Sequence, residues 1–232
     1  MATSHGGPLA AALQDLQHIF GERLLAMVGY GHHGAGHAPS LALVRSITGD
    51  DLDRCASHAA SWHRAGCATP LLLTQDEFAG SLDAFPIEYG EIMATHHVIF
   101  GANPFAGLTI RPEDLRRACE IQVKSHLVHL RENYIESRGN QADVRALVAE
   151  GAPAFRVLLR RLAHLDGAAA ETDADLSSFA SRRPGLDPRV VGDVLAIAKN
   201  PEGSGVDAMR VYGGYVAAVE QLWRFIDRWK AE

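Results

Sequence analysis

AMVGYGHHGAGHAPSLALV, residues 26–44, is the segment of the chain that decides the predicted fold. Two short apolar runs flank a corner with four glycines, Gly29, Gly31, Gly34 and Gly36. Because glycine adopts backbone angles that are closed to other residues, the pattern predicts a strand, a tight corner and a second strand. The corner either brings backbone N–H groups close to a ligand phosphate or is a plain connection between strands. Glycine spacing alone does not choose between these interpretations.

The order of these features resembles the signature of the nucleotidyltransferase superfamily, which has the DNA polymerase beta-like fold. In that signature an apolar strand runs into Gly-Ser, then into a short glycine-containing segment, and then into Asp-x-Asp on the next strand. Gly31-His32 stands at the position of Gly-Ser, and Gly36 stands at the position of the later glycine. Residues 39–43, Pro-Ser-Leu-Ala-Leu, stand at the position of Asp-x-Asp and contain no carboxylate.

This departure determines the function that the resemblance implies. In the family the two aspartates hold the magnesium ions that bridge the nucleotide triphosphate and the attacking hydroxyl. A chain that lacks both aspartates has lost the oxygen ligands that magnesium prefers. The sequence therefore predicts a degenerate active-site motif with no catalytic residue and no cofactor, and Mg2+ belongs only to an alternative in which other carboxylates take over.

Further segments resemble a group of uncharacterised bacterial proteins classed as nucleotidyltransferase-like. These segments are residues 69–78, 81–89, 98–101, 115–120 and 127–134. With them the similarity extends over roughly residues 20 to 135. It identifies relatives better than it identifies an activity, because the catalytic motif of the family is the part that does not match.

Length and composition limit the class of protein. The 232 residues, 25.0 kDa in mass, suffice for one large domain or two of ordinary size. A content of 47% hydrophobic and 22% charged residues is typical of a soluble globular protein. The formal charge of −6, from 22 basic and 28 acidic residues, argues against a general nucleic-acid binder. No run approaches the ~18 apolar residues of a membrane span, so no membrane partner is expected.

The cysteines and the N-terminus indicate a cytoplasmic protein. Cys55, Cys67 and Cys119 are odd in number and include no Cys-x-x-Cys pair, so neither a disulfide framework nor a zinc knuckle is predicted. Residues 1–8 have no basic region followed by an apolar core, which a secretion signal would require. The oligomeric state stays open.

Residues 1–110 are predicted to form a nucleotidyltransferase-like α/β domain with a mixed sheet and helices. Strands are expected at residues 23–28, 41–47, 70–73 and 97–101. Helices are expected at residues 9–20, from Thr48 or Asp50 to about Gly66, and from a capping box at Thr74 through Phe78 and Leu82. Residues 82–92 are too interrupted to predict a clean element.

Residues 111–232 are predicted to form a helical bundle domain of four to five helices without a strand. Helices are expected at residues 112–134, 144–165, 187–199 and 206–229. Pro153 either kinks the second of these or separates a short helix from a longer one. Residues 167–175 are interpreted as a connection.

Any ligand pocket is expected between the glycine corner and the first bundle helix, because the resembled family places its active cleft there. The residues expected to bound it are Gly31, His32, Gly36, Ser40 and Glu88, with Lys124 or Arg131 as cations. Glu88 lies close to the position of a third family carboxylate, but a lone glutamate cannot assemble a two-metal centre. His32 replaces a small hydroxyl, so its imidazole either blocks a triphosphate or holds a smaller anion when protonated, and we expect blockage.

The histidines near the corner allow two interpretations. His32, His33 and His37 could meet His96 and His97 in a site for a soft metal, because imidazole is a common ligand of zinc, copper and nickel. They are otherwise polar loop residues, and no ligand spacing supports a metal site, so none is predicted.

Three functional hypotheses follow. The first is a nucleotidyltransferase-like protein without catalysis that acts as a binding or regulatory module for a small molecule or a protein partner. The second is an active transferase that moves a nucleoside monophosphate to a small-molecule or protein hydroxyl, using Glu88 and other carboxylates. The third is an interaction protein with no nucleotide ligand.

Overall fold

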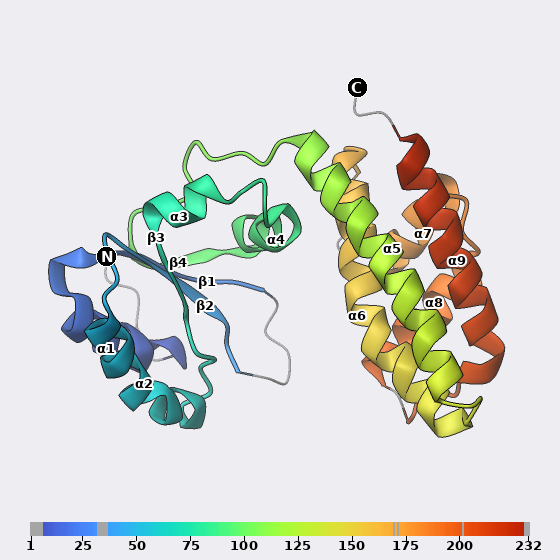
Figure 1. Ribbon diagram of the computed structural model, residues 1–232, viewed down its shortest axis with the longest axis horizontal. Coiled ribbons are helices and arrows are strands. Elements are labelled where there is room, and N and C mark those ends of the chain that lie inside the picture. The colour runs from blue at the N-terminus through green and yellow to red at the C-terminus, as the bar shows by residue number, and fades with distance from the viewer. Residues whose placement is uncertain (1–6, 32–36, 169, 171, 201, 230–232) are drawn as a thin grey trace. The chain divides into compact units, whose positions relative to one another are not determined.

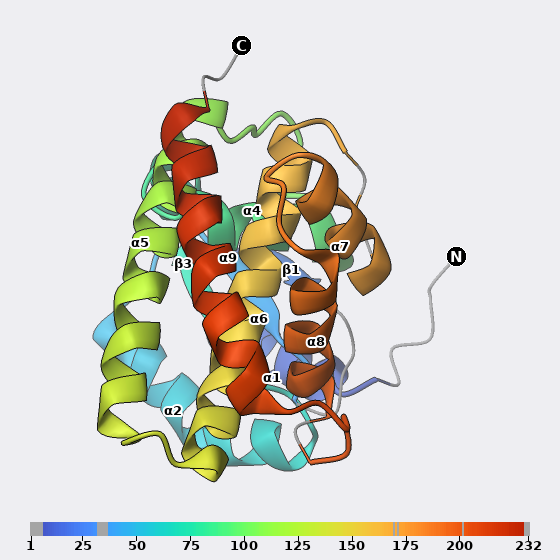
Figure 2. The ribbon, with the colours of Figure 1, turned by 90° about the vertical axis from the view of Figure 1, so that its right-hand side faces the viewer.

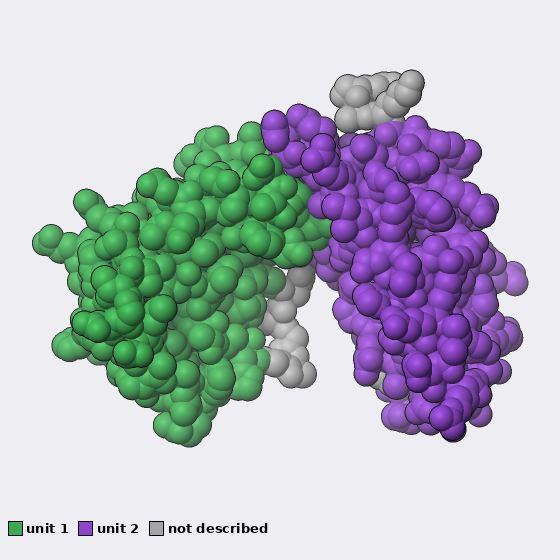
Figure 3. Space-filling view, in the orientation of Figure 1, with its two compact units in different colours: residues 1–110 green, residues 111–232 purple. Residues whose placement is uncertain are grey.

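The computed structural model describes residues 7–31, 37–168, 170, 172–200 and 202–229. The chain divides into two compact units, Met1–Ile110 and Arg111–Glu232, coloured separately in Figure 3. The first unit holds a sheet with helices, and the second is helical where it is described (Figure 1). The predicted fold class, a mixed sheet with helices followed by a helical region, is confirmed.

The sheet of the first unit has four strands in the order β3-β2-β1-β4. The strands are β1 (Leu24–Gly29), β2 (Ser40–Val44), β3 (Leu71–Thr74) and β4 (His97–Gly101). β1 is antiparallel to both β2 and β4, whereas β2 is parallel to β3, so the sheet is mixed as predicted. β2 ends at Val44 instead of the expected residue 47, because the chain leaves the sheet to reach Thr48, the N-cap of the next helix.

The helices of the first unit are α1 (Leu9–Phe20), α2 (Gly49–Arg64), α3 (Gln75–Gly80) and α4 (Pro86–Thr95), with a 3-10 turn η1 (Gly21–Arg23) after α1. Thr48 and Thr74 each form a full capping box, with Asp51 and Glu77 respectively, which satisfies N–H groups that a helix start leaves open. The capping box predicted at Thr74 is confirmed, although its helix ends at Gly80 and does not reach residue 82.

Helix α4 corrects the expectation that residues 82–92 form no clean element. Pro86 stands in the first turn, where its fixed backbone angle favours a helix and its missing N–H costs nothing. Ile87, Tyr89 and Ile92 then bury one face of the helix. Residues 86–92 are therefore compatible with a helix, because the proline that had suggested an interruption is where the helix starts.

Helices cover both faces of the sheet. Figure 1 shows α1 and α2 on one side and α3 and α4 on the other. The cluster on the α1 and α2 side includes Leu13, Leu16, Met27, Ala42, Val44 and Trp62. The cluster on the other side includes Val28, Leu41, Leu43, Phe78, Tyr89, Ile92 and Phe105. Strands β1 and β2 therefore lie between two apolar layers.

The second unit is a bundle of five helices in the residues that the structure describes (Figure 2). They are α5 (Pro112–Glu136), α6 (Gln141–Leu165), α7 (Asp173–Arg182), α8 (Pro188–Lys199) and α9 (Ala208–Arg228). α6 runs through Pro153 as one helix, so Pro153 does not separate two helices. Sequence reasoning missed α7, whose start at Thr172 and Asp175 falls inside the predicted connection. No helix in the described part of the chain is both long and apolar enough to cross a membrane.

Candidate functional site

Strand β2 occupies the position at which the resembled family carries Asp-x-Asp. Its side chains alternate between the two faces of the sheet, with Leu41 and Leu43 on one face and Ser40, Ala42 and Val44 on the other. All five residues are buried. Whichever alignment with the motif is chosen, β2 presents no carboxylate and no side chain to solvent.

Aromatic rings fill the space over Leu41 and Leu43. The rings of Phe78 and Tyr89 stack with centroids 4.5 Å apart, and the ring of Phe105 lies 5.0 Å from that of Phe78. These rings belong to the same buried cluster as the two leucines. This face of β2 is therefore covered by packed apolar side chains.

Ser40 is the polar side chain of β2. Its Oγ is buried and makes no conventional hydrogen bond with the described residues. Its polar neighbour is the Cys67 thiol, a weak hydrogen-bonding group. Burial raises the pKa of Cys67, and the Ser40 hydroxyl partly offsets this rise. Ser40 is thus enclosed in the protein and does not face an open pocket.

The structure describes both ends of the glycine corner. Gly31 has φ +75°, a left-handed conformation that favours glycine. Its backbone N–H donates to Thr95 Oγ1 at 2.9 Å, and that hydroxyl donates to the carbonyl of Glu91. The Gly31 N–H is therefore already bonded within the protein. His32 and Gly36, two of the predicted ligand-binding residues, lie outside the described residues, as does His33.

A histidine ring packs onto the end of β1. A Cβ atom added to Gly29 would lie only 2.5 Å from Cε1 of His97, so a larger residue would displace the ring. Gly29 pairs with His97 across β1 and β4 and with Ser40 across β1 and β2. The glycine at the end of β1 is thus explained by the close approach of an imidazole.

The described histidines do not assemble a metal site. His37 Nε2 donates to the carbonyl of His63 at 2.9 Å, and the two rings meet edge to face with centroids 5.4 Å apart. His96 Nδ1 donates to the carbonyl of Met93 at 2.8 Å. Within the described residues no group of three His, Cys, Asp or Glu side chains is placed to hold a metal ion. The described side chains therefore do not fit the magnesium centre that the resembled family uses.

The charged members of the predicted pocket each occupy a defined place within their own unit. Glu88 is exposed on α4, between the buried Ile87 and Tyr89. Lys124 Nζ lies 2.5 Å from Glu120 Oε1 and 5.5 Å from the centre of the Trp223 ring.

Arg131 likewise has an acidic partner in the second unit, with its Nη2 2.5 Å from Glu220 Oε1. Both predicted cations are therefore engaged by carboxylates. Gly31, Ser40 and Glu88 belong to the first unit and Lys124 and Arg131 to the second, and their sharing one ligand pocket stays a prediction.

The bundle contains a polar pair that sequence reasoning missed, in which Tyr215 is buried and His126 is half-buried. His126 Nε2 on α5 and the Tyr215 hydroxyl on α9 share a hydrogen bond of 2.6 Å. Burial lowers the pKa of His126 from 6.5 to about 4 and raises the pKa of Tyr215. A Cβ on Gly151 would lie 3.1 Å from His126 Cε1, so this glycine leaves room for the ring. The available signal was the spacing of His126, which lies three residues after Val123 and seven after Cys119 on the buried side of its helix.

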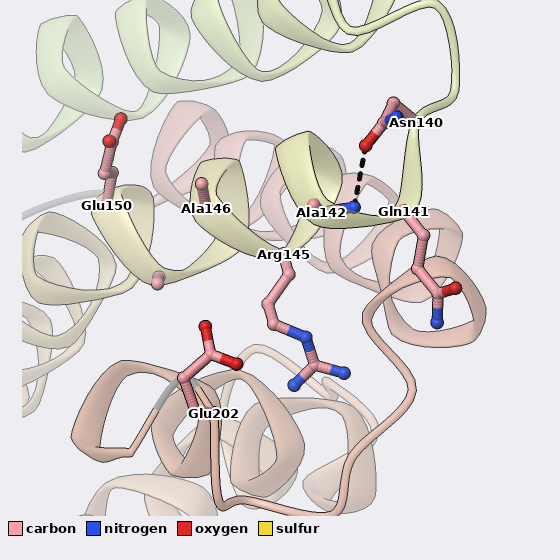
Figure 4. A pocket seen from close by; sticks show the side chains of 8 residues that line it. Asn140, Gln141, Ala142, Arg145, Ala146, Glu150 and Glu202 are labelled. Carbon is pink, nitrogen blue, oxygen red and sulfur yellow. Dashed lines mark hydrogen bonds between the residues drawn. The ribbon is translucent and has the colours of Figure 1, made fainter.

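A second missed feature is a hollow of about 670 Å3 in the second unit. Figure 4 shows its lining, which comes from the first turns of α6 and from the chain before α9: Asn140, Gln141, Ala142, Arg145, Ala146, Ala149, Glu150 and Glu202. Arg145 donates to the carbonyl of Val206 at 3.1 Å, which ties the two sides together. No motif in the sequence indicated this hollow.

A comparison with solved structures found a protein of similar architecture. The crystal structure of the spectinomycin adenyltransferase of Enterococcus faecialis, solved with ATP and spectinomycin, aligns with a TM-score of 0.54. The alignment covers 95% of this chain and 98% of that chain, at 12% sequence identity. The chain has a nucleotidyltransferase-like fold.

The likeness at this identity concerns the fold alone and says nothing about the degenerate motif. No protein-family model matches the sequence. No curated protein matches it either. The resemblance inferred from the sequence is thus supported at the level of the fold.

Proposed function

We propose that this nucleotidyltransferase-like chain does not transfer nucleotides and acts as a binding or regulatory module for a small molecule or a protein partner. The observation that carries the proposal is strand β2, in which residues 40–44 are buried and contain no carboxylate. Metal-assisted phosphoryl transfer depends on carboxylates that position the ions. In this proposal residues 1–110 form the nucleotidyltransferase-like domain, residues 111–232 form the helical domain, and no cofactor is used.

The packing around β2 supports the proposal beyond the missing residues. Leu41 and Leu43 are covered by the rings of Phe78, Tyr89 and Phe105. A carboxylate placed there would lose its hydration without gaining a partner, which costs several kcal/mol, about the stability of a marginal domain. The position therefore differs from that of an active site in which only one residue has changed, because its volume is also filled.

The hydrogen bonds at the glycine corner support the same proposal. A loop that cradles a phosphate does so with free backbone N–H groups. After β1 the N–H of Tyr30 donates to the carbonyl of Pro39, and the N–H of Gly31 donates to Thr95 Oγ1. A triphosphate at this N–H would have to break that bond. This favours the interpretation of the corner as a connection between β1 and β2.

The test is a transfer assay with the purified full chain, ATP labelled at the α-phosphate, and magnesium or manganese. Spectinomycin is the first acceptor to try, because the structural neighbour was solved with ATP and spectinomycin. We expect no labelled product. By calorimetry we expect no magnesium-dependent triphosphate binding tighter than roughly millimolar, about −4 kcal/mol. Micromolar binding that a chelator abolishes, or transfer to any hydroxyl, would establish the active-transferase alternative instead.

A His32→Ser variant separates the two ways in which the motif departs from the family. The substitution restores a small hydroxyl after Gly31 but restores no carboxylate, so we expect it to stay inactive in the same assay. Nucleotide transfer by this single variant would show that the missing aspartates are not decisive. The unchanged chain assayed in parallel is its control.

A further inference from the structure

The hollow in the second unit is lined on one side by small side chains of α6. Ala142, Ala146 and Ala149 follow one another at intervals of four and three residues, so they lie on one face of the helix. This alanine face borders the hollow opposite the chain before α9 (Figure 4). Because methyl groups fill little volume, about 670 Å3 stays open between the two segments. Small-molecule sites in proteins have volumes of roughly 300–1,000 Å3.

The wall opposite α6 is held by its own hydrogen bonds. The N–H of Gly203 donates to Asn200 Oδ1 at 3.0 Å, and the N–H of Val206 donates to Ser204 Oγ at 3.3 Å. Arg145 Nη2 on α6 then donates to the carbonyl of Val206 at 3.1 Å. The two walls are therefore joined without a ligand, and a site that is already formed costs a ligand less ordering free energy.

Polar side chains of both charges face the hollow. Arg145 extends from α6 toward the chain before α9, and Glu202 extends from that chain toward α6 (Figure 4). Gln141 extends from α6 on the same side as Arg145 and offers an amide donor and acceptor. Glu202 is exposed and forms no hydrogen bond or ion pair with the described residues. The Arg145 guanidinium has five N–H donors, more than the carbonyl of Val206 accepts.

These charges discriminate between kinds of ligand. An anion is attracted by Arg145 but repelled by Glu202, and Glu150 on the lining adds to that repulsion. A cation is attracted by the glutamates but repelled by Arg145. A molecule that carries one carboxylate and one ammonium group meets an opposite charge with each, and both hydrogen bonds are charge-assisted. The hollow therefore fits a small zwitterion better than it fits an ion of either sign.

We propose that the hollow binds a free α-amino acid with an apolar side chain. Its carboxylate accepts from Arg145 and Gln141, its ammonium group donates to Glu202, and its side chain lies on the alanine face. The inference rests on the proposed function as a small-molecule binding module and names the ligand class and the site. Dissociation in the millimolar range is expected, because the ligand is small and several lining residues are exposed to solvent.

The test is a ligand-detected NMR titration of the purified full chain with leucine. Leucinamide lacks the carboxylate and N-acetylleucine lacks the ammonium group, so they are the matched probes. We expect saturable binding of leucine and binding of each of the other two that is weaker by about tenfold or more, because each loses one charge-assisted contact and meets one like charge. The proposal fails if leucine shows no saturable binding, or if either probe binds as tightly as leucine.

Two substitutions locate the binding. Ala146→Phe fills the hollow from an exposed position and should abolish leucine binding, whereas Ala217→Phe, at an exposed position of α9 outside the lining, is the control and should not. Glu202→Gln keeps the size of the side chain and removes its charge. It should reduce the preference for leucine over N-acetylleucine and keep the preference over leucinamide, a pattern that general loosening of the loop would not produce.

Leucine binding that survives Ala146→Phe, or a preference over N-acetylleucine that is unchanged in Glu202→Gln, would overturn the proposal. These titrations contain no nucleotide, so a negative result rejects this ligand class and leaves the proposed absence of nucleotide transfer standing. Conversely, labelled product in the transfer assay would reject the proposed function even in a chain that binds leucine.

Discussion

Strand β2 and the His126–Tyr215 pair differ in the polar groups that the protein interior holds. At β2, where the resembled family needs two carboxylates, the structure buries apolar side chains on both faces of the sheet. In the bundle a half-buried histidine and a buried tyrosine meet, and each provides the hydrogen-bonding partner of the other. The first region is apolar on both faces of its strand, whereas the helical half holds a polar interior contact in which each group has a partner.

The strongest test of this comparison places a charge in β2. Leu41→Asp should lower the free energy of unfolding by about 4 kcal/mol or more, because it puts an unpartnered carboxyl group into a packed apolar cluster. Urea denaturation measures the loss. Leu52→Asp, at an exposed helix position, is the control and should cost less than about 1 kcal/mol. If Leu41→Asp were tolerated as well as the control, β2 would be open enough to serve as a binding site.

The next largest effect is expected in the pH dependence of the free energy of unfolding, through His126 of the bundle. Burial lowers the pKa of His126 to about 4, so between 6.5 and about 4 the unfolded chain binds more protons at this residue than the folded chain. The free energy of unfolding should therefore be highest above pH 6.5 and fall as the pH drops to about 4, by at most about 3 kcal/mol from this residue.

Chemical denaturation at a series of pH values measures this slope. A His126→Phe variant removes the titrating group and should flatten the slope between pH 6.5 and 4. The carboxyls of Asp51, Glu77 and Glu120 have lowered pKa values in the folded chain and add to the loss of stability near pH 4, but they are present in both proteins and cancel in the comparison. An unchanged slope in His126→Phe would assign the pH dependence to other groups.

A smaller effect is expected from the tyrosine partner. Tyr215→Phe removes the hydroxyl and leaves the buried Nε2 of His126 without its hydrogen bond, which should cost about 2 kcal/mol. A double-mutant cycle with His126→Phe isolates the interaction between the two side chains. Additive losses in the cycle would mean that the 2.6 Å contact contributes nothing to stability.

The smallest effect is expected at Ser40. Its buried hydroxyl makes no conventional hydrogen bond, so Ser40→Ala should change the free energy of unfolding by less than about 1 kcal/mol and in the stabilising direction. Thermal unfolding of the two proteins under one condition measures it. A loss of about 2 kcal/mol would show that the hydroxyl has a strong partner and that β2 is less apolar than its neighbours indicate.

Local sequence signals predicted much of the fold. Alternating and apolar runs located β1, β2 and β3, and the capping box at Thr74 located the start of α3. Helix α4 was missed because Pro86 and Gly90 are usually helix breakers, whereas Pro86 falls in the first turn, where proline is tolerated. Helix α7 was missed because it is short and follows a stretch of small residues.

The candidate site was predictable only in part. The absence of a carboxylate in residues 39–43 could be read directly from the sequence. The rings that fill the space over Leu41, and the bond from Gly31 to Thr95, join residues far apart in the chain. No local pattern encodes such contacts, because they depend on how α3, α4 and the chain after β4 pack against the sheet. Sequence reasoning also missed the ion pairs of Lys124 with Glu120 and of Arg131 with Glu220. The second of these could not be predicted from a local pattern, because Glu220 lies on another helix.

The pairing of β1 also constrains how the chain folds. β1 can pair with β2 as soon as the corner between them closes, but its other edge waits for β4, which follows after α2, β3, α3 and α4. Contacts between such distant segments form slowly, because a long loop must be ordered before they contribute. During synthesis on the ribosome the hairpin of β1 and β2 is therefore made with both outer edges unpaired, and the edge of β1 stays so after β3 has paired with β2. An unpaired strand edge is prone to aggregation, so β4 protects the nascent chain as well as completing the sheet.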